Sequence, residues 1–168
     1  IKEAGIVGLG GAGFPTHLKM NKKPDVKIEQ VILNGAECEP YLTSDQLNME
    51  LYPQKAIGGL KIIMKLMDCD KGYIGVEDNK QKAIGILKNA AKDEKNISIC
   101  SVKTKYPQGD ERRLINAITG KKISKAQRSN ERGVQGLNIS SAMAIYDAVV
   151  HSIPLTHRIV TMTGSAIK

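Results

Sequence analysis

A glycine-rich segment near the amino terminus has the composition of a loop that holds a phosphate-bearing ligand. Residues 8–16 read Gly-Leu-Gly-Gly-Ala-Gly-Phe-Pro-Thr, which places glycines at Gly8, Gly10, Gly11 and Gly13. These positions expose backbone N–H groups and let a ligand approach the main chain closely. Lys19 follows shortly afterwards and can place a point charge on a phosphate. The alternative is a plain glycine-rich turn, but four glycines, a proline and a lysine exceed what a turn requires.

The same segment does not meet the requirements of the ordinary dinucleotide fingerprint. Its spacing formally matches G-x-G-x-x-G, but that motif needs a preceding strand, a helix directly after it and an acidic residue about 20 residues further on. Only Ile6 and Val7 are available for the strand, and Phe14-Pro15 interrupts the expected start of the helix. The spacing alone therefore does not predict a standard Rossmann site.

A second polar string begins where a buried strand is expected to end. Asn34 closes the strand predicted over residues 29–34, and Glu37 and Glu39 follow two residues apart. In an extended segment such side chains point the same way, so both carboxylates could accept hydrogen bonds from one ligand. Asn34 is equally a common residue of strand-end turns, and the two glutamates are equally suited to capping a helix or solvating a loop.

Two further candidates stand at expected helix starts. Gly109 and Asp110 open a helix predicted over residues 110–119, and Asn138 precedes a later helix. Acidic residues are stabilised at helix amino termini by the helix dipole whatever their function, and Asn is a good N-cap. Helix amino termini also bind phosphates, so capping and ligand binding are compatible at these positions.

Strand-like and helix-like segments alternate along the chain, which favours an α/β organisation. Strands are predicted over residues 29–34, 72–77, 97–102 and 158–163, and helices over residues 53–67, 79–93, 110–119 and from 138 onward. Residues 121–133 are polar and basic without periodicity and are predicted to form a long loop. We therefore predict a three-layer, Rossmann-like α/β domain with a mainly parallel sheet flanked by helices. Its ligand site is expected at the carboxyl edge of the sheet.

Composition narrows the classes of function. The chain has 168 residues and a net charge of +8, and one Phe, five Tyr and no Trp predict an aliphatic core. No stretch approaches the about 20 apolar residues of a membrane span, so direct membrane insertion is not expected. The three cysteines and three histidines lack metal-ligand spacing, so no metal site is expected. The positive charge permits a phosphate ligand, an acidic partner or nucleic acid, but aromatics do not alternate with the basic residues, and nucleic acid is not an expected partner.

Taken together, the motifs resemble the FMN-binding domain of the complex I 51-kDa subunit family, which includes the C subunit of the ion-translocating Rnf complex. Residues 8–16 with Lys19, residues 34–41, residues 104–109 and, more weakly, residues 135–138 match in the family's order. Tyr41 and the Lys-Tyr-Pro-Gln-Gly string at residues 105–109 are more similar to the Rnf protein than to complex I. The resemblance implies that residues 1–164 form an FMN- and NADH-binding domain and that residues 165–168 begin a linker to a further domain.

The resemblance also implies a role for each candidate residue. The four glycines would wrap FMN and its phosphate, Lys19 would meet polar oxygens of the cofactor, and Asn34 would contact the flavin. Phe14 would lie beside the nicotinamide–flavin stack or the adenine of NADH. The remaining implied contacts are Glu37 and Glu39 at the NADH site, Gly109 and Asp110 near both ligands, and Asn138 near the flavin phosphate.

The activity implied by the resemblance is hydride transfer from NADH to FMN, with no side chain needed as an acid or base. Electrons would pass on to 4Fe-4S clusters in a part of the protein that this chain lacks. The chain, which begins with Ile, is interpreted as a fragment or a processed product. Its partners would be other subunits of a membrane-bound electron transport complex, on the cytoplasmic side of the cell membrane as a peripheral subunit.

Two positions depart from the complex I pattern and leave alternatives open. Leu9 stands where complex I relatives carry Arg, and Leu137 replaces the first of two adjacent Asn residues. These changes favour a flavin-free scaffold or assembly domain as one alternative. Another is an electron-transfer subunit feeding a reductase, such as the proline reductase-associated homologue of the Rnf protein.

Overall fold

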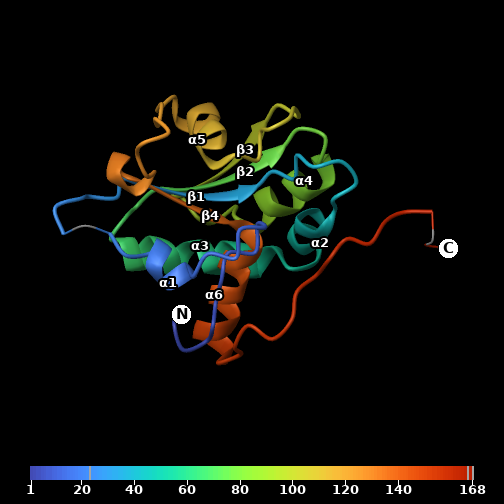
Figure 1. Ribbon diagram of the computed structural model, residues 1–168, viewed down its shortest axis with the longest axis horizontal. Helices are drawn as coiled ribbons and strands as arrows, with labels where there is room; N and C mark the ends of the chain where they lie inside the picture. Colours follow the sequence, from blue (N-terminus) through green and yellow to red (C-terminus); the bar gives the residue numbers. More distant parts are fainter. Residues whose placement is uncertain (23, 166, 168) are drawn as a thin grey trace.

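A four-stranded, all-parallel sheet forms the centre of the computed structural model, which describes residues 1–22, 24–165 and 167 (Figure 1). The strands are β1 (Gln30–Gly35), β2 (Gly72–Glu77), β3 (Ile97–Val102) and β4 (Val134–Asn138). Their order across the sheet is β3-β2-β1-β4. In this register Asn34 on β1 lies beside Asn138 on β4, so two of the predicted site residues are neighbours at the carboxyl edge.

Helices cover both faces of the sheet. The helices are α1 (Thr16–Lys19), α2 (Ser44–Leu51), α3 (Pro53–Met67), α4 (Gln81–Ala90), α5 (Glu111–Thr119) and α6 (Ile139–His151), with a 3₁₀ turn η1 (Asn130–Arg132). Apolar side chains of α3, α4 and α6 form one core with the sheet, and those of α5 form a second core on the opposite face. The predicted three-layer α/β fold is therefore confirmed.

The core is aliphatic, as the composition predicts. Its largest fully buried side chains are Ile, Leu and Met. The helices α3 and α6 cross at small residues, because a Cβ atom at Gly59 would lie 2.2 Å from the Ala142 carbonyl oxygen. Among the described residues, no helix combines the length and apolar character needed to cross a bilayer.

Several predicted boundaries differ from the structure. The helix predicted over residues 79–93 is the shorter α4, and the loop predicted over residues 121–133 contains η1. The helix α2 was not predicted. The proposed linker at residues 165–168 remains a prediction, and residues 166 and 168 lie outside the described part of the chain.

The strand predicted over residues 158–163 is wrong. This segment is extended, but it joins no sheet, and its apolar residues Val160 and Met162 are 59% and 77% exposed. The fourth strand is instead β4, whose residue Val134 is fully buried beside β1. The local sequence pattern did not distinguish these two segments. Only β4 lies beside another strand, and this pairing depends on residues far away in the sequence.

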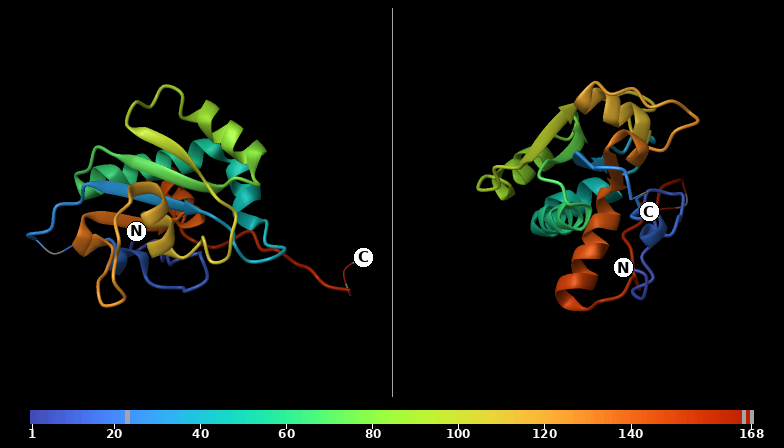
Figure 2. Two further views of the ribbon diagram at one scale, coloured as in Figure 1. Left: turned by 90° about the horizontal axis from the view of Figure 1, so that it is seen from above. Right: turned by 90° about the vertical axis from the view of Figure 1, so that its left-hand side faces the viewer.

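The end of the chain runs alongside its beginning. The Leu155 N–H donates to the Ala4 carbonyl at 3.0 Å, and an Arg158 guanidinium N–H donates to the Leu9 carbonyl at 3.2 Å. The red carboxyl-terminal segment therefore passes the blue amino-terminal segment in both views of Figure 2. This arrangement brings residues 158–161 to the rim of the glycine-rich loop.

Candidate functional site

A cleft of about 860 Å³ opens at the carboxyl edge of the sheet. Its walls come from the glycine-rich loop, the segment after β1, the start of α5, the β4–α6 junction and the carboxyl-terminal segment. Eleven of the twelve predicted site residues line it: Gly8, Gly10, Gly11, Phe14, Lys19, Asn34, Glu37, Glu39, Gly109, Asp110 and Asn138. Segments separated by more than a hundred residues thus converge on one hollow, as expected for the carboxyl edge of a parallel sheet.

The glycine-rich loop folds back on itself at the mouth of the cleft. The Gly8 N–H donates to the Phe14 carbonyl at 2.8 Å, and the Gly13 N–H donates to the Gly8 carbonyl at 3.1 Å. Gly11 and Gly13 have φ angles of +109° and +62°, which side chains disfavour. Gly13 is the one predicted residue that does not line the cleft, and it closes the loop instead.

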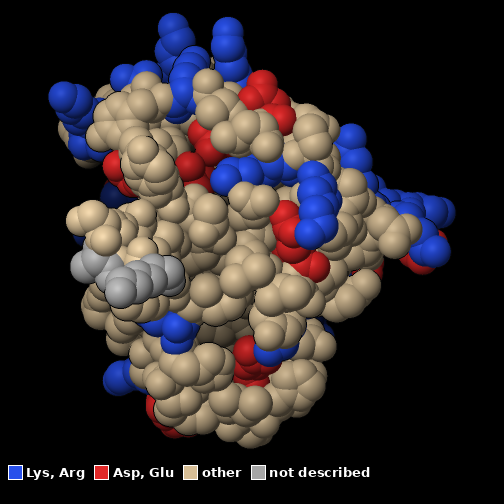
Figure 3. Space-filling view, turned by 90° about the vertical axis from the view of Figure 1, so that its right-hand side faces the viewer, with Lys and Arg blue, Asp and Glu red and all other residues tan. Residues whose placement is uncertain are grey.

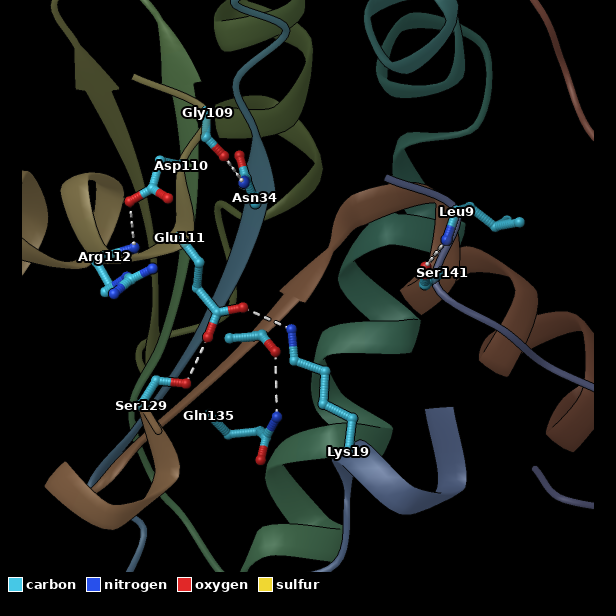
Figure 4. A network of polar contacts seen from close by, with 11 residues as sticks. Leu9, Lys19, Asn34, Gly109, Asp110, Glu111, Arg112, Ser129, Gln135 and Ser141 are labelled. Carbon is cyan, nitrogen blue, oxygen red and sulfur yellow. Dashed lines mark hydrogen bonds and ion pairs between the residues drawn. The ribbon is translucent and has the colours of Figure 1, made fainter. Parts of the chain in front are cut away.

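Lys19 reaches the cleft from α1 and is paired there with an acidic side chain. Its Nζ lies 2.5 Å from Glu111 Oε2, and Ser129 donates its hydroxyl to the other oxygen of Glu111 (Figure 4). The Lys19 and Glu111 side chains are each about one-third exposed, at 32% and 33%. The ammonium group therefore keeps donor capacity that faces solvent and the cleft.

Asn34 joins the end of β1 to the loop before α5. Its Nδ2 donates to the Gly109 carbonyl at 2.8 Å (Figure 4). Its Oδ1 accepts from the Ala36 N–H at 3.0 Å. A Cβ atom at Gly109 would lie only 2.7 Å from the Ala36 carbonyl oxygen. Glycine at position 109 is therefore required by the close approach of the two segments that form this wall.

The two glutamates after β1 have different environments. Glu37 caps α2, because its carboxylate accepts hydrogen bonds from the Asp45 and Gln46 N–H groups at 2.8 and 2.9 Å and from the Ser44 hydroxyl. Glu39 is exposed, and its carboxylate makes no hydrogen bond or ion pair to any described residue. The capping interpretation of Glu37 is correct, whereas Glu39 is open to a ligand.

Asp110 and Asn138 both cap helices while lining the cleft. Asp110 Oδ1 accepts from the Arg112 and Arg113 N–H groups at the start of α5. Asn138 Oδ1 accepts from the Ser140 and Ser141 N–H groups at the start of α6, at 3.0 and 3.2 Å. The two helix amino termini therefore point at the cleft, which favours a negatively charged ligand group there.

Comparison with known proteins places the chain among flavin-binding domains. The family model of the Nuo51 FMN-binding domain matches residues 1–147. The chain belongs to this family. The resemblance to the complex I 51-kDa family predicted from the sequence is therefore confirmed.

Two of the relatives that match the whole chain are C subunits of ion-translocating complexes. The chain is 46% identical over all its residues to the C subunit of a proton-translocating ferredoxin:NAD(+) oxidoreductase complex from Clostridium ljungdahlii, covering 36% of that protein. The same identity is found with the C subunit of the Na(+)-translocating complex from Acetobacterium woodii, of which 38% is covered. The chain thus spans little more than a third of the length of these relatives.

Solved structures show the same fold in more distant proteins. The NAD+-reducing [NiFe]-hydrogenase in the air-oxidised state matches with a TM-score of 0.77 at 22% identity, over 89% of this chain and 29% of that one. At this identity the likeness concerns the fold.

The sequence alone did not predict several residues of the cleft. Ser141 accepts a hydrogen bond from the Leu9 N–H at 2.8 Å (Figure 4), Arg158 holds the Leu9 carbonyl, and Asp45 contacts Asn138. Their partners lie 93 to 149 positions away in the sequence, so no local pattern indicates them. The Thr-Ser-Asp string at residues 43–45 is typical of a helix start and was the one available signal for α2.

Acidic side chains outnumber basic ones in the cleft. Its charged lining comprises Glu37, Glu39, Asp45, Asp110 and Glu111 against Lys19 and Arg158. Burial raises the pKa of Asp45, and the charge of Glu37 acts in the same direction. Basic and acidic side chains interleave on the face in Figure 3, which looks at the side of the molecule toward which the strands run.

The cysteines are free thiols, and Cys38 lines the cleft. Within the described residues, no three His, Cys, Asp or Glu side chains are grouped so as to hold a metal ion. The cleft thus presents hydrogen-bonding groups, helix amino termini and one exposed aromatic ring, Phe14, which is 47% exposed.

Proposed function

We propose that the cleft binds FMN and accepts NADH beside it. The observation that carries the proposal is the convergence of eleven predicted residues on one cleft in a chain of the FMN-binding family. The volume of about 860 Å³ lies in the range of about 300–1,000 Å³ typical of small-molecule and cofactor sites.

The backbone of the glycine-rich loop fits an oxygen-rich ligand. Gly10, Gly11 and Ala12 line the cleft, and their three consecutive N–H groups donate no hydrogen bond to any described residue. Successive backbone N–H groups in a turn form an anion-binding concavity, and Lys19 adds a positive charge nearby. These groups and the amino terminus of α6 would hold the phosphate and polar oxygens of FMN.

The acceptor groups of the cleft suit a second ligand with hydroxyl and amide donors. The Glu39 carboxylate is open, and Asp110 keeps one oxygen that accepts no hydrogen bond from the described residues. Phe14 presents an exposed ring against which the nicotinamide or adenine of NADH can stack. These three residues would orient NADH toward the flavin.

The chemistry belongs to the cofactor, and the protein supplies binding and orientation. When bound, FMN would accept a hydride from NADH and release single electrons to iron–sulfur clusters elsewhere in the full-length protein. The related proteins are subunits of ion-translocating ferredoxin:NAD(+) oxidoreductase complexes. We therefore propose that this chain works in such a complex, as part of a peripheral subunit on the cytoplasmic side of the membrane.

An absorption titration with FMN, followed by anaerobic addition of NADH, tests the proposal. Bound flavin whose visible bands bleach with NADH supports it. The absence of FMN binding even at high cofactor concentration would favour the flavin-free scaffold. FMN binding without bleaching would refute the assignment of the NADH site but leave the assignment of the FMN site standing.

A pair of glycine variants tests the placement of the loop. Gly11→Val should abolish FMN binding, because valine disfavours the φ of +109° and blocks the main chain. Gly164→Val is the matched control, since Gly164 also has a positive φ, of +129°, but does not line the cleft. Equal FMN affinity of the two variants would contradict the assignment of the loop.

A further inference from the structure

Asp45, in the first turn of α2, lies between two hollows of the molecule. It lines the main cleft and also a smaller pocket of about 190 Å³ between α2, α6 and residues 153–159. Glu37 fixes the first turn of α2, to which Asp45 belongs, because its carboxylate accepts a hydrogen bond from the Asp45 N–H. Asp45 is therefore held in place on its backbone side, and its side chain points to the start of α6.

Both carboxylate oxygens of Asp45 accept hydrogen bonds from the start of α6. Asn138 Nδ2 donates to Oδ2 at 2.8 Å, and the Ser140 hydroxyl donates to Oδ1. Asn48 Nδ2 donates in turn to the Ser140 oxygen at 2.8 Å. Since Asn138 Oδ1 already caps α6, its amide is held at both ends and has one orientation.

The glycine-rich loop rests on this same turn of α6. A Cβ atom at Gly10 would lie 3.2 Å from Asn138 Cβ, so the loop and the Asn138 side chain are in contact. The neighbouring Leu9 N–H donates a hydrogen bond to the Ser141 hydroxyl oxygen. The position of the loop therefore depends on the side chain that Asp45 orients.

We propose that Asp45 is a positioning residue of the flavin site, which fixes the Asn138 amide and, through it, the seat of the glycine-rich loop. The inference rests on the proposed function of the cleft in FMN binding. It gives a role to a residue that lies in none of the sequence motifs.

The charges that act on Asp45 come from two segments. Glu37 on the segment after β1 repels the carboxylate, and Arg158 on the carboxyl-terminal segment attracts it. Burial is the largest influence and raises the pKa of Asp45. The other titratable residues around the smaller pocket are Tyr52, Lys55, Asp147 and His157.

Exchange of the two partners is the decisive test. Asn138→Asp places two carboxylates opposite each other and should lower the urea midpoint of the cofactor-free chain, although Asp remains a good N-cap. The double variant D45N/N138D restores a carboxylate facing an amide in reversed order and should recover most of that loss. Stability is the readout because position 138 lines the cleft, where a new carboxylate would itself repel a phosphate. Absence of rescue, with both variants folded by circular dichroism, would overturn the proposal.

Asp45→Ala supplies a second arm with a matched control. It should weaken FMN binding at least tenfold and speed hydrogen exchange of the Asn138 side-chain amide, measured by NMR without any cofactor. Asp147→Asn is the control, because Asp147 lines the same small pocket and is paired with Lys55 at 2.8 Å. It should leave both readouts unchanged.

The two readouts separate this proposal from the proposed function. If the original chain does not bind FMN, the assignment of the cleft fails while the amide exchange still tests Asp45. If FMN binds normally to Asp45→Ala and the Asn138 amide exchanges as before, the positioning role is wrong and FMN binding stands.

Discussion

Replacing Glu77 with Gln should stabilise the domain at neutral and alkaline pH. Glu77 ends β2 and is only 1% exposed, and neither of its carboxylate oxygens has a hydrogen-bond partner among the described residues. Burial raises its pKa, and the charges of Asp78 and Glu37 act in the same direction, whereas the charge of Lys80 and the nearby backbone N–H of Lys105 lower it. The ionised side chain therefore destabilises the folded state, and an amide of the same shape removes the charge.

The magnitude follows from the extra cost of the charge. A buried amide leaves its own polar atoms unpaired, so the substitution removes only the excess cost of the ionised form, which is about 1.4 kcal/mol for each unit by which the folded-state pKa is raised. In a domain of this size, 1 kcal/mol corresponds to about 2–4 °C in Tm, so the Gln variant should melt a few degrees higher at pH 8. Because the folded-state pKa is the raised one, the penalty is absent below the unfolded pKa of about 4.3 and develops as the pH rises toward the folded pKa.

Thermal unfolding followed by circular dichroism from pH 4 to pH 8 measures this effect. The difference in Tm between Glu77→Gln and the original chain should be small near pH 4 and reach a plateau at high pH. Glu3→Gln, at an exposed position, is the control and should change Tm little at any pH. A Gln variant that melts lower at pH 8, or gains equally at every pH, would refute the reasoning.

Three further substitutions probe the packing and the cleft. Gly59→Ala should lower the free energy of unfolding in urea by about 1–3 kcal/mol, because its Cβ would lie 2.2 Å from the Ala142 oxygen. Gly85→Ala is the control and should cause no loss, because a Cβ there would have no atom within 4 Å. Glu37→Gln weakens the α2 cap and should lower the same free energy by about 0.5–2 kcal/mol; an unchanged urea midpoint would contradict the capping role. Lys19→Ala should change stability by less than about 1 kcal/mol but reduce FMN affinity at least tenfold in a fluorescence titration, and the reverse pattern would make Lys19 a structural residue.

The sequence was sufficient where local chemistry decides the structure. Pro53 stands at the first turn of α3, Asp110 and Asn138 cap α5 and α6, and Gly120 ends α5 with a φ of +72°. Each of these residues acts on backbone groups a few positions away, so its type and spacing predict the boundary. The parallel sheet followed from the alternation of such elements.

The sequence was insufficient where a distant partner decides the structure. Val160 stands in a short apolar run and Val134 does not, yet only Val134 is buried, because the edge of β1 pairs with its segment. Asp45 was missed for a related reason, since its hydrogen-bond partner Asn138 is 93 positions away. Tertiary pairing of this kind leaves no periodic signal in a single sequence.

The hydrogen bonds in the cleft also rank its predicted residues by the capacity that each keeps for a ligand. Glu37 uses both oxygens on the amino terminus of α2, and Asn34 uses its amide on Gly109 and Ala36. Lys19 has three donors and one bonded partner among the described residues, and the Glu39 carboxylate has none. Since a donor or acceptor that is already satisfied gains little from a ligand, Lys19 and Glu39 should contribute most of the side-chain contacts to FMN and NADH. Glu37 and Asn34 should act mainly by holding the walls of the cleft in position.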